Sequence, residues 1–150
     1  MAGESFQFNQ AKGRIRTLAD LTGATDAVLV VPLEADGLEA DATLKDYDDL
    51  AALLAGASNE QTTMGRKTIT AFTITVDDVN DWVTVTLGSA FTWTAPTGPP
   101  LGKLLLCYDS DTTTGTDANI MPMLAYHFDS TPDGIDLQIT AHANGLIRLT

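Results

Sequence analysis

The last third of the chain alternates short apolar runs with turn sequences, and this pattern constrains the fold more than any other feature. Two apolar runs, Leu104–Tyr108 and Ile120–Phe128, flank a polar loop of Asp, Thr and Gly residues. A Thr-Pro-Asp-Gly turn at 131–134 precedes two shorter runs, Ile135–Thr140 and Leu146–Leu149. Short β-prone runs separated by Gly, Pro and Asp turns are typical of antiparallel strands.

The middle of the chain extends this pattern. Alternating runs at Lys67–Val76 and Trp82–Leu87 are joined by the loop Asp77–Asp81, which has the length of a hairpin connection. Further strands are predicted at Ala27–Leu33 and Ala90–Ala95. A total of about eight strands at this spacing predicts a mainly β fold, an antiparallel β-sandwich or barrel-like domain.

One short helix and an extended N-terminal arm complete the predicted architecture. Leucines and a tyrosine recur at helical spacing within 45–55, and Gly56 follows as a stop signal. Residues 1–25 contain three glycines, and we expect an extended arm there. A chain of 150 residues suits one domain, so we expect residues 26–150 to form a single β-rich domain.

The charge is strongly acidic and unevenly distributed. Twenty acidic residues against eight basic ones give a formal net charge of −12. Such an excess argues against nucleic-acid binding, because phosphate contacts need lysine and arginine. Residues 1–19 depart from this pattern, with three basic residues against one acidic residue. A basic segment before an acidic body is typical of an interaction arm, and a frayed terminus with incidental charges is the alternative.

Four residues of this segment are the candidate partner-binding residues. Lys12, Arg14 and Arg16 alternate with Gly13 and Ile15. In an extended arm, the three basic side chains would point to one side and Ile15 to the other. We therefore expect Lys12, Arg14 and Arg16 to bind an acidic groove on a partner, with Ile15 entering an apolar pocket beside it.

The single cysteine and the distribution of apolar residues limit the compartment. Cys107 lies within the run Leu104–Tyr108, so we expect it to be buried and unreactive, and it has no second cysteine to pair with. No apolar stretch of signal-peptide type opens the chain. No run approaches the roughly 18–20 apolar residues of a membrane span. We expect a protein made or assembled in a reducing compartment, with no membrane partner.

The loop Asp109–Asp117 is the only string with the composition of a metal site. An EF-hand loop needs glycine at its sixth position and a bidentate glutamate at its twelfth. Thr114 and Ile120 occupy those positions here, so the pattern fails. A looser calcium site is the alternative to a plain strand-connecting loop. With one cysteine and two histidines, the chain is also short of the usual zinc ligands.

Two further groups of residues have both a structural and a functional interpretation. The carboxylates of the loop 77–81 can form a solvated turn, or serve glycoside hydrolysis if two of them face a cleft. Trp82, Phe91 and Trp93 can fill the core, or form a platform for sugars. We favour the structural interpretation of both groups. The sequence therefore predicts a protein with no catalytic residues, no metal and no cofactor.

Several strings, taken in order, resemble a group of small virion proteins from tailed phages, especially phages of actinobacteria. The earlier strings are DDLA at 48–51, NE at 59–60, GRKTIT at 65–70, VDD at 76–78 and FTWTA at 91–95. The more specific strings are KLLLCYD at 103–109, GTDANIMP at 115–122, HF at 127–128, TPDG at 131–134 and GLIRLT at 145–150. The resemblance covers about residues 44–150.

The resemblance implies a capsid decoration, or head-stabilising, protein without catalytic residues. Such a protein would bind the major capsid protein on the capsid exterior as a homotrimer, after assembly in the host cytoplasm. The basic arm would supply part of the contact. The alternative is a host-attachment or glycan-binding β module of a tail or fibre, which clustered and exposed Trp82 and Trp93 would favour. A glycosidase built on acidic residues is a third and weaker hypothesis.

The failed calcium pattern generates a prediction. We expect the thermal unfolding midpoint to be the same in calcium and in EDTA, because no ligand set in the sequence would bind the folded state selectively. A calorimetric or circular dichroism melt in both buffers measures this. A midpoint raised by more than about 4 °C in calcium, on the order of 1 kcal/mol or more for a domain of this size, would contradict it.

Overall fold

The computed structural model describes residues 4–140, 142 and 145–149, and within these the fold is mainly β and antiparallel, as predicted. Strands β2, β7 and β8 are the longest elements. The elements are β1 (Phe6–Gln7), η1 (Asn9–Ala11), α1 (Ile15–Ala19), β2 (Ala27–Glu34), α2 (Asp41–Leu44), α3 (Leu50–Ala55), β3 (Lys67–Ile69), β4 (Phe72–Asp77), β5 (Trp82–Leu87), β6 (Phe91–Trp93), β7 (Leu101–Asp109), η2 (Asp117–Asn119), β8 (Ile120–Ser130), β9 (Leu137–Ile139) and β10 (Ile147–Leu149).

A five-stranded sheet in the order β1-β8-β7-β2-β3 forms the centre of the molecule. Its inner strands pair in long registers, with Leu29 opposite Cys107 and Leu106 opposite Leu124. Nearly every residue of β2 and β7 is buried. The sheet is therefore covered on both faces, which explains why these strands are continuous apolar runs instead of alternating ones.

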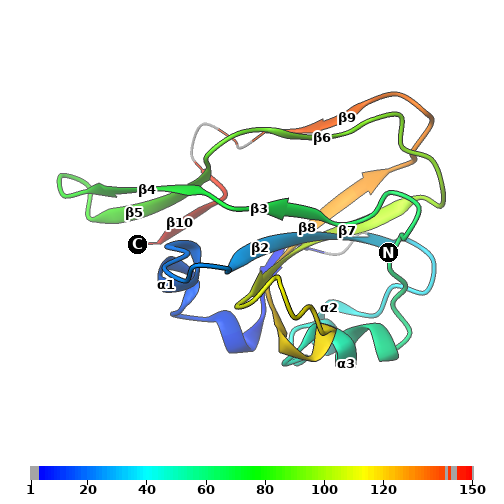
Figure 1. Ribbon diagram of the computed structural model, residues 1–150, viewed down its shortest axis with the longest axis horizontal. Coiled ribbons are helices and arrows are strands. Elements are labelled where there is room, and N and C mark those ends of the chain that lie inside the picture. The colour runs from blue at the N-terminus through cyan, green and yellow to red at the C-terminus, as the bar shows by residue number, and fades with distance from the viewer. Residues whose placement is uncertain (1–3, 141, 143–144, 150) are drawn as a thin grey trace.

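Two layers cover the central sheet, one on each face (Figure 1). Alternate residues of β2 and β7, such as Leu29 and Leu105, pack against α3 and the segment around Phe8. The intervening residues, such as Val30 and Leu106, pack against the other layer, which holds the sheet β10-β5-β4 and the pair β6-β9. Because successive side chains of a strand point to opposite faces, one strand supplies both cores.

The predicted sandwich-like arrangement is present, and the barrel alternative is not. In the described part of the chain, the central sheet ends in the edge strands β1 and β3 and does not close. The run predicted as one strand over 67–76 is divided at Thr70–Ala71 into β3 and β4, which belong to different sheets. This division and the two-residue β1 account for most of the difference from the predicted strand number.

Of the single helix predicted over 45–55, only the second half is helical, as α3, and the unpredicted α2 lies before this range. The Oδ1 atom of Asp49 accepts a hydrogen bond of 2.7 Å from the backbone N–H of Ala52, so Asp49 is the N-cap of α3. Short acidic side chains favour caps over helix interiors because they bind backbone N–H groups locally. The acidic stretch before Leu50 thus starts the helix instead of forming its first turn.

The prediction of an extended arm over 1–25 is wrong for the described residues. Phe8, Ala11, Ile15 and Leu18 are all buried in the cores, and β1 pairs with β8. Ala11, Ile15 and Leu18 are spaced by four and three residues and pack in one core, whereas Phe8 packs in the other. Residues 4–25 therefore belong to the same folded domain as the rest of the chain.

A buried lysine fastens this N-terminal segment to the central sheet. Lys103 of β7 is fully buried, and its Nζ atom donates to the Glu4 carbonyl at 2.8 Å. The same atom lies 3.1 Å from Asp41 Oδ1 and 5.0 Å from the centre of the Phe6 ring. The other carboxylate oxygen of Asp41 accepts from the Glu4 N–H at 2.7 Å. A buried charge needs such partners, so β7, α2 and the N-terminal segment are held together.

We predict that Asp41→Asn destabilises the fold by about 2–4 kcal/mol at pH 7, because Lys103 would stay buried without a counter-charge. Burial opposes ionisation of Asp41, but the Glu4 N–H and the Lys103 ion pair hold its pKa below the ordinary 3.8. The stabilisation is therefore complete above pH 4 and is lost as the pH falls through the lowered pKa. Urea unfolding at pH 7 and pH 3 tests this, with the exposed Asp36→Asn as control. Equal losses for the two variants at pH 7 would contradict it.

Candidate functional site

The structure places the four predicted partner-binding residues differently from the sequence prediction. Lys12 and Arg14 are exposed on the turn between η1 and α1. Ile15 is only 3% exposed and packs in the core of its own chain, so its predicted role in a partner's pocket is wrong. Arg16 is a backbone member of α1, and its side chain lies outside the described part of the structure.

The surface around Lys12 and Arg14 has mixed charge. The Nζ atom of Lys12 donates to Asn9 Oδ1 at 2.7 Å. The amide of Asn9 donates in turn to Asp46, so a carboxylate lies one side chain away from the lysine. Arg14 reaches the sulfur of Met121 at 3.8 Å. The two basic side chains can therefore bind an acidic partner surface, but nearby carboxylates weaken their field.

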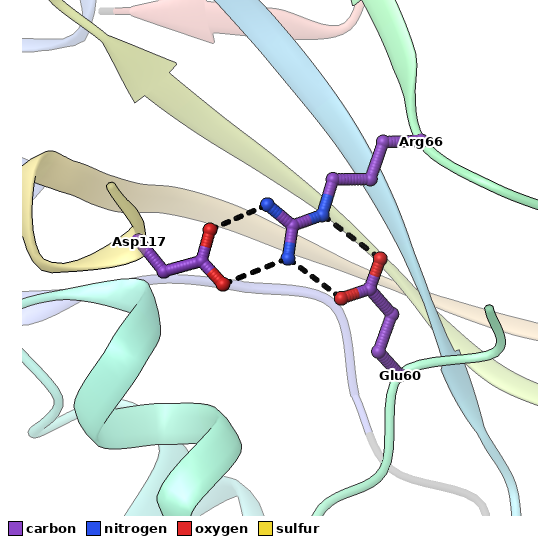
Figure 2. A network of polar contacts seen from close by, with 3 residues as sticks. All are labelled: Glu60, Arg66 and Asp117. Carbon is purple, nitrogen blue, oxygen red and sulfur yellow. Dashed lines mark hydrogen bonds and ion pairs between the residues drawn. The ribbon is translucent and has the colours of Figure 1, made fainter. Parts of the chain in front are cut away.

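The strongest polar cluster of the described residues is an arginine held by two carboxylates, which we call the Arg66 clamp (Figure 2). Arg66 donates from Nε and Nη2 to Glu60 at 2.8 and 2.6 Å. It donates from Nη1 and Nη2 to Asp117 at 2.6 and 2.9 Å. Both pairs are bidentate, the arrangement in which arginine–carboxylate contacts are strongest. The clamp ties the loop after α3 to η2.

The electrostatics of the clamp support a structural role. Hydrogen bonds to Asp117 and Glu60 raise the pKa of the Arg66 guanidinium above its already high value. The same contact with Arg66 lowers the pKa of Asp117. Arg66 and Asp117 are therefore charged at neutral pH. Because the guanidinium makes four hydrogen bonds to protein carboxylates, little of its donor capacity is left for a ligand.

The clamp joins three of the strings that carry the family resemblance. Glu60 ends NE, Arg66 lies in GRKTIT and Asp117 lies in GTDANIMP. Sequence reasoning missed their association, since Arg66 and Asp117 are 51 residues apart and no local period relates them. No local signal in the sequence singled out Arg66.

The loop Asp109–Asp117 uses its carboxylates for turn hydrogen bonds. Asp109 accepts from the N–H of Asp111 at 3.0 Å. Hydrogen bonds from Thr113 and Thr114 lower the pKa of Asp111. Asp117 points to Arg66 instead of toward the loop. Within the described residues, no group of three His, Cys, Asp or Glu side chains is arranged to hold a metal ion.

The aromatic residues do not form an exposed platform. Trp93 is 2% exposed, and its Nε1 donates to the Gly65 carbonyl at 2.9 Å. Phe91 packs edge-on against it with ring centres 5.3 Å apart. Trp82 begins β5, in a different sheet from Trp93. The tryptophan cluster that would favour glycan binding is therefore absent from the described structure.

The carboxylates of the loop 77–81 also have a local role. Asp77 accepts hydrogen bonds of 3.0 Å from the N–H groups of Val79 and Asn80 at the hairpin tip. This is the geometry of an Asx turn, in which an aspartate stabilises the chain reversal that follows it. Asp77 is therefore accounted for by the turn that it stabilises.

Two of the hollows in the described structure meet at His127. A groove of about 770 Å³ is lined by acidic residues such as Glu39 and Asp129, together with Lys45 and His127. An apolar pocket of about 250 Å³ lies between the central sheet and the layer of small sheets. His127 touches both, and its Nε2 lies 3.1 Å from Asp129.

Comparison with known proteins found no matching protein family, no matching curated protein and no matching solved structure. None of the described helices is long and apolar enough to cross a membrane. Cys107 is buried, as predicted, and burial raises the pKa of its thiol.

We predict that Arg66→Met destabilises the fold by roughly 2–3 kcal/mol at pH 7, since two partly buried carboxylates would face each other unpaired. Arg66→Lys should lose less stability than Arg66→Met, because lysine keeps the positive charge. It should still be less stable than wild type, because lysine cannot form the bidentate contacts. Thermal melts should show a fall of roughly 4–12 °C for Arg66→Met. The difference in midpoint between wild type and Arg66→Met should shrink below pH 4, because Asp117 becomes protonated as the pH falls through its lowered pKa. Unchanged midpoints for both variants would show that the clamp is dispensable.

Proposed function

We propose that this protein is a capsid decoration protein, a structural virion component that binds the lattice of the major capsid protein in a tailed phage. The family resemblance over residues 44–150 supports this proposal. The proposal is also supported by the fact that the resembling strings form structural parts of the fold. The strings at 103–109 and 115–122 contribute the central strand β7 and the start of β8, and three strings meet in the Arg66 clamp.

The single observation that carries the proposal is that the resembling residues build a scaffold and not a reaction centre. Lys103, Cys107 and Arg66 are the chemically distinctive side chains of these strings. Each is fixed by burial or by protein partners. A head-stabilising protein needs a rigid body of this kind, because it acts by binding the assembled shell more tightly than the free subunits.

The charge supports a position on the capsid exterior. Residues 20–150 hold 19 acidic residues against five basic ones, so the whole acidic excess lies outside the first 19 residues. On the inside of a capsid, the packaged nucleic acid would repel such an acidic surface. On the outside, the acidic residues face solvent and meet no such repulsion. Virion assembly in the host cytoplasm is part of the same proposal.

For the contact with the major capsid protein, we propose Lys12 and Arg14, with Arg16 beside them. Ile15 supports this contact indirectly, because its burial anchors the turn that presents the basic residues. Exposed ion pairs are worth only about 0–1 kcal/mol each. A homotrimer, the oligomer implied by the resemblance, would bring three such contacts to the shell together and so raise the avidity.

The alternative, a glycan-binding or host-attachment module, receives less support. It depends on exposed aromatic side chains, and Trp93 is buried by its own domain.

The decisive experiment measures occupancy on purified capsids that lack the protein. Deleting residues 1–19 is unsuitable, since the deletion would remove five buried core residues, Phe8, Ala11, Ile15, Leu18 and Ala19. We expect Lys12→Ala with Arg14→Ala to lower occupancy at low salt, because two charge-assisted contacts are lost. The exposed pair Ser89→Glu with Ala90→Glu changes the net charge by the same amount and is the matched control.

Two outcomes would contradict these proposals separately. If wild-type protein does not bind the capsids, the decoration function is wrong. If wild type binds and both double variants bind equally well, the function stands but the contact lies elsewhere on the body.

A further inference from the structure

The two-stranded pair β6–β9 is the smallest unit of the layer that covers the central sheet. Within the described residues its strands pair only with each other, Phe91 with Ile139 and Trp93 with Leu137. The pair lies above the central sheet in Figure 1. An isolated two-stranded sheet is at best marginally stable in water, so its position depends on what packs beneath it.

The two ends of this pair are held differently. Trp93 is 2% exposed, and its Nε1 donates to the Gly65 carbonyl at 2.9 Å, so this end is tied to the body. Phe91 and Ile139 form the other end and are only half-buried. They share a face with Trp93 and Leu137, because alternate residues of a strand point the same way. Both of them line the apolar pocket of about 250 Å³.

Apolar side chains from both layers line this pocket. Val30 of β2 and Leu104 and Leu106 of β7 contribute from the central sheet, and Phe91 and Ile139 contribute from the pair above it. No lysine, arginine, aspartate or glutamate is among the described residues that line the pocket. Water needs polar partners to be held in a cavity, so a pocket with this lining favours apolar contents.

Tyr126 also lines the pocket, and its polar atom is already satisfied by the protein. Its hydroxyl donates to the Leu146 carbonyl at 2.8 Å. Burial raises the pKa of Tyr126 to about 12, which is the direction expected for a phenol in surroundings poor in water. The side of the pocket formed by β8 is therefore dry as well.

The other polar residues that border the pocket leave its interior apolar. His127 lies opposite Lys103 in the β7–β8 register, so its side chain is on the face of the sheet turned to the N-terminal segment. Thr140 and His142 are exposed and therefore lie at the rim. The pocket thus has an apolar interior and a polar rim, the usual arrangement of a small-molecule site.

We propose that this pocket is a binding site for a small uncharged apolar molecule, an aromatic ring with a short alkyl chain. An apolar cavity of about 150 Å³ binds benzene, so a pocket of about 250 Å³ takes roughly ten carbon atoms. A fatty acid fits less well, because a chain with a net charge of −12 repels a carboxylate.

The ligand would support the end of the strand pair that the protein itself supports least. Folded proteins contain few voids larger than a water molecule. A pocket of this size beneath Phe91 and Ile139 is therefore a place where an added molecule gains contacts with both layers. The ligand would hold β6 and β9 against the central sheet. This inference does not rest on the proposed function.

The first test is a titration of the full-length protein with toluene, followed by NMR of the methyl groups. The resonances of Leu104 and Leu106 should shift. Those of Leu29 and Leu105, which belong to the core on the other face of the same two strands, should not. Benzoate has a ring of the same size and a negative charge, so it is the control ligand and should shift none of them.

Two results of this titration would overturn the proposal. One is the absence of a shift at Leu104 and Leu106 in saturating toluene. The other is a shift of equal size at Leu105 or with benzoate, which would indicate non-specific binding of aromatic molecules.

The second test compares thermal melts of wild type, Ile139→Trp and Gln138→Trp with and without toluene. Ile139→Trp places a large side chain in the pocket. Gln138→Trp adds the same side chain at the neighbouring exposed position and is the matched control. At ten times the dissociation constant, toluene should raise the midpoint of wild type and Gln138→Trp by about 3–6 °C. It should leave Ile139→Trp unchanged.

An equal rise in all three proteins would overturn the proposal. If Ile139→Trp does not fold, the methyl titration of wild type decides by itself. A partner's side chain is the competing occupant. If toluene does not bind to wild type, and Ile139→Trp but not Gln138→Trp loses capsid binding, the proposal is wrong and the pocket takes an apolar side chain of the capsid protein. A wild type that binds toluene but not capsids would contradict the proposed function alone.

Discussion

Burial of the central sheet on both faces is the constraint on which the rest of the structure depends. Strands β2 and β7 bring apolar side chains to each face, so neither face can be left to solvent. An antiparallel sheet usually has one face exposed to solvent, and alternating polar residues in the strands then identify that face. Here the continuous runs demand two covering layers. The helices α2 and α3 and the residues around Phe8 supply one, and the small sheets together with η1 and α1 supply the other.

The two covering layers consist of short elements, and polar contacts from two charged side chains help to hold these elements in place. Lys103 extends from the sheet to hold the N-terminal segment and α2. Arg66 joins two loops that no regular element connects. Buried or half-buried ions stabilise little compared with apolar packing, but they penalise any arrangement that leaves them unpaired. Their contribution is to select one arrangement of short segments from the many that would bury similar area.

Local pattern was enough to predict much of the fold. The β4–β5 hairpin, β2, β7 and β8 follow from runs and turns that lie next to each other in sequence. The N-terminal segment was missed because Gly13 and nearby basic residues suggested an arm, while its buried residues at helical spacing are divided between two short elements, η1 and α1. For the candidate site, the exposure of Lys12 and Arg14 agrees with the sequence prediction. The burial of Ile15 does not, because strand-like alternation was assumed where a helix begins.

Contacts between residues that are far apart in the sequence could not be predicted from local patterns. Glu4 and Asp41 meet at Lys103 only because β1 is placed beside β8 and α2 lies beneath the sheet. Nothing in the local sequence around Lys103 distinguishes it from a solvent-facing lysine on an edge.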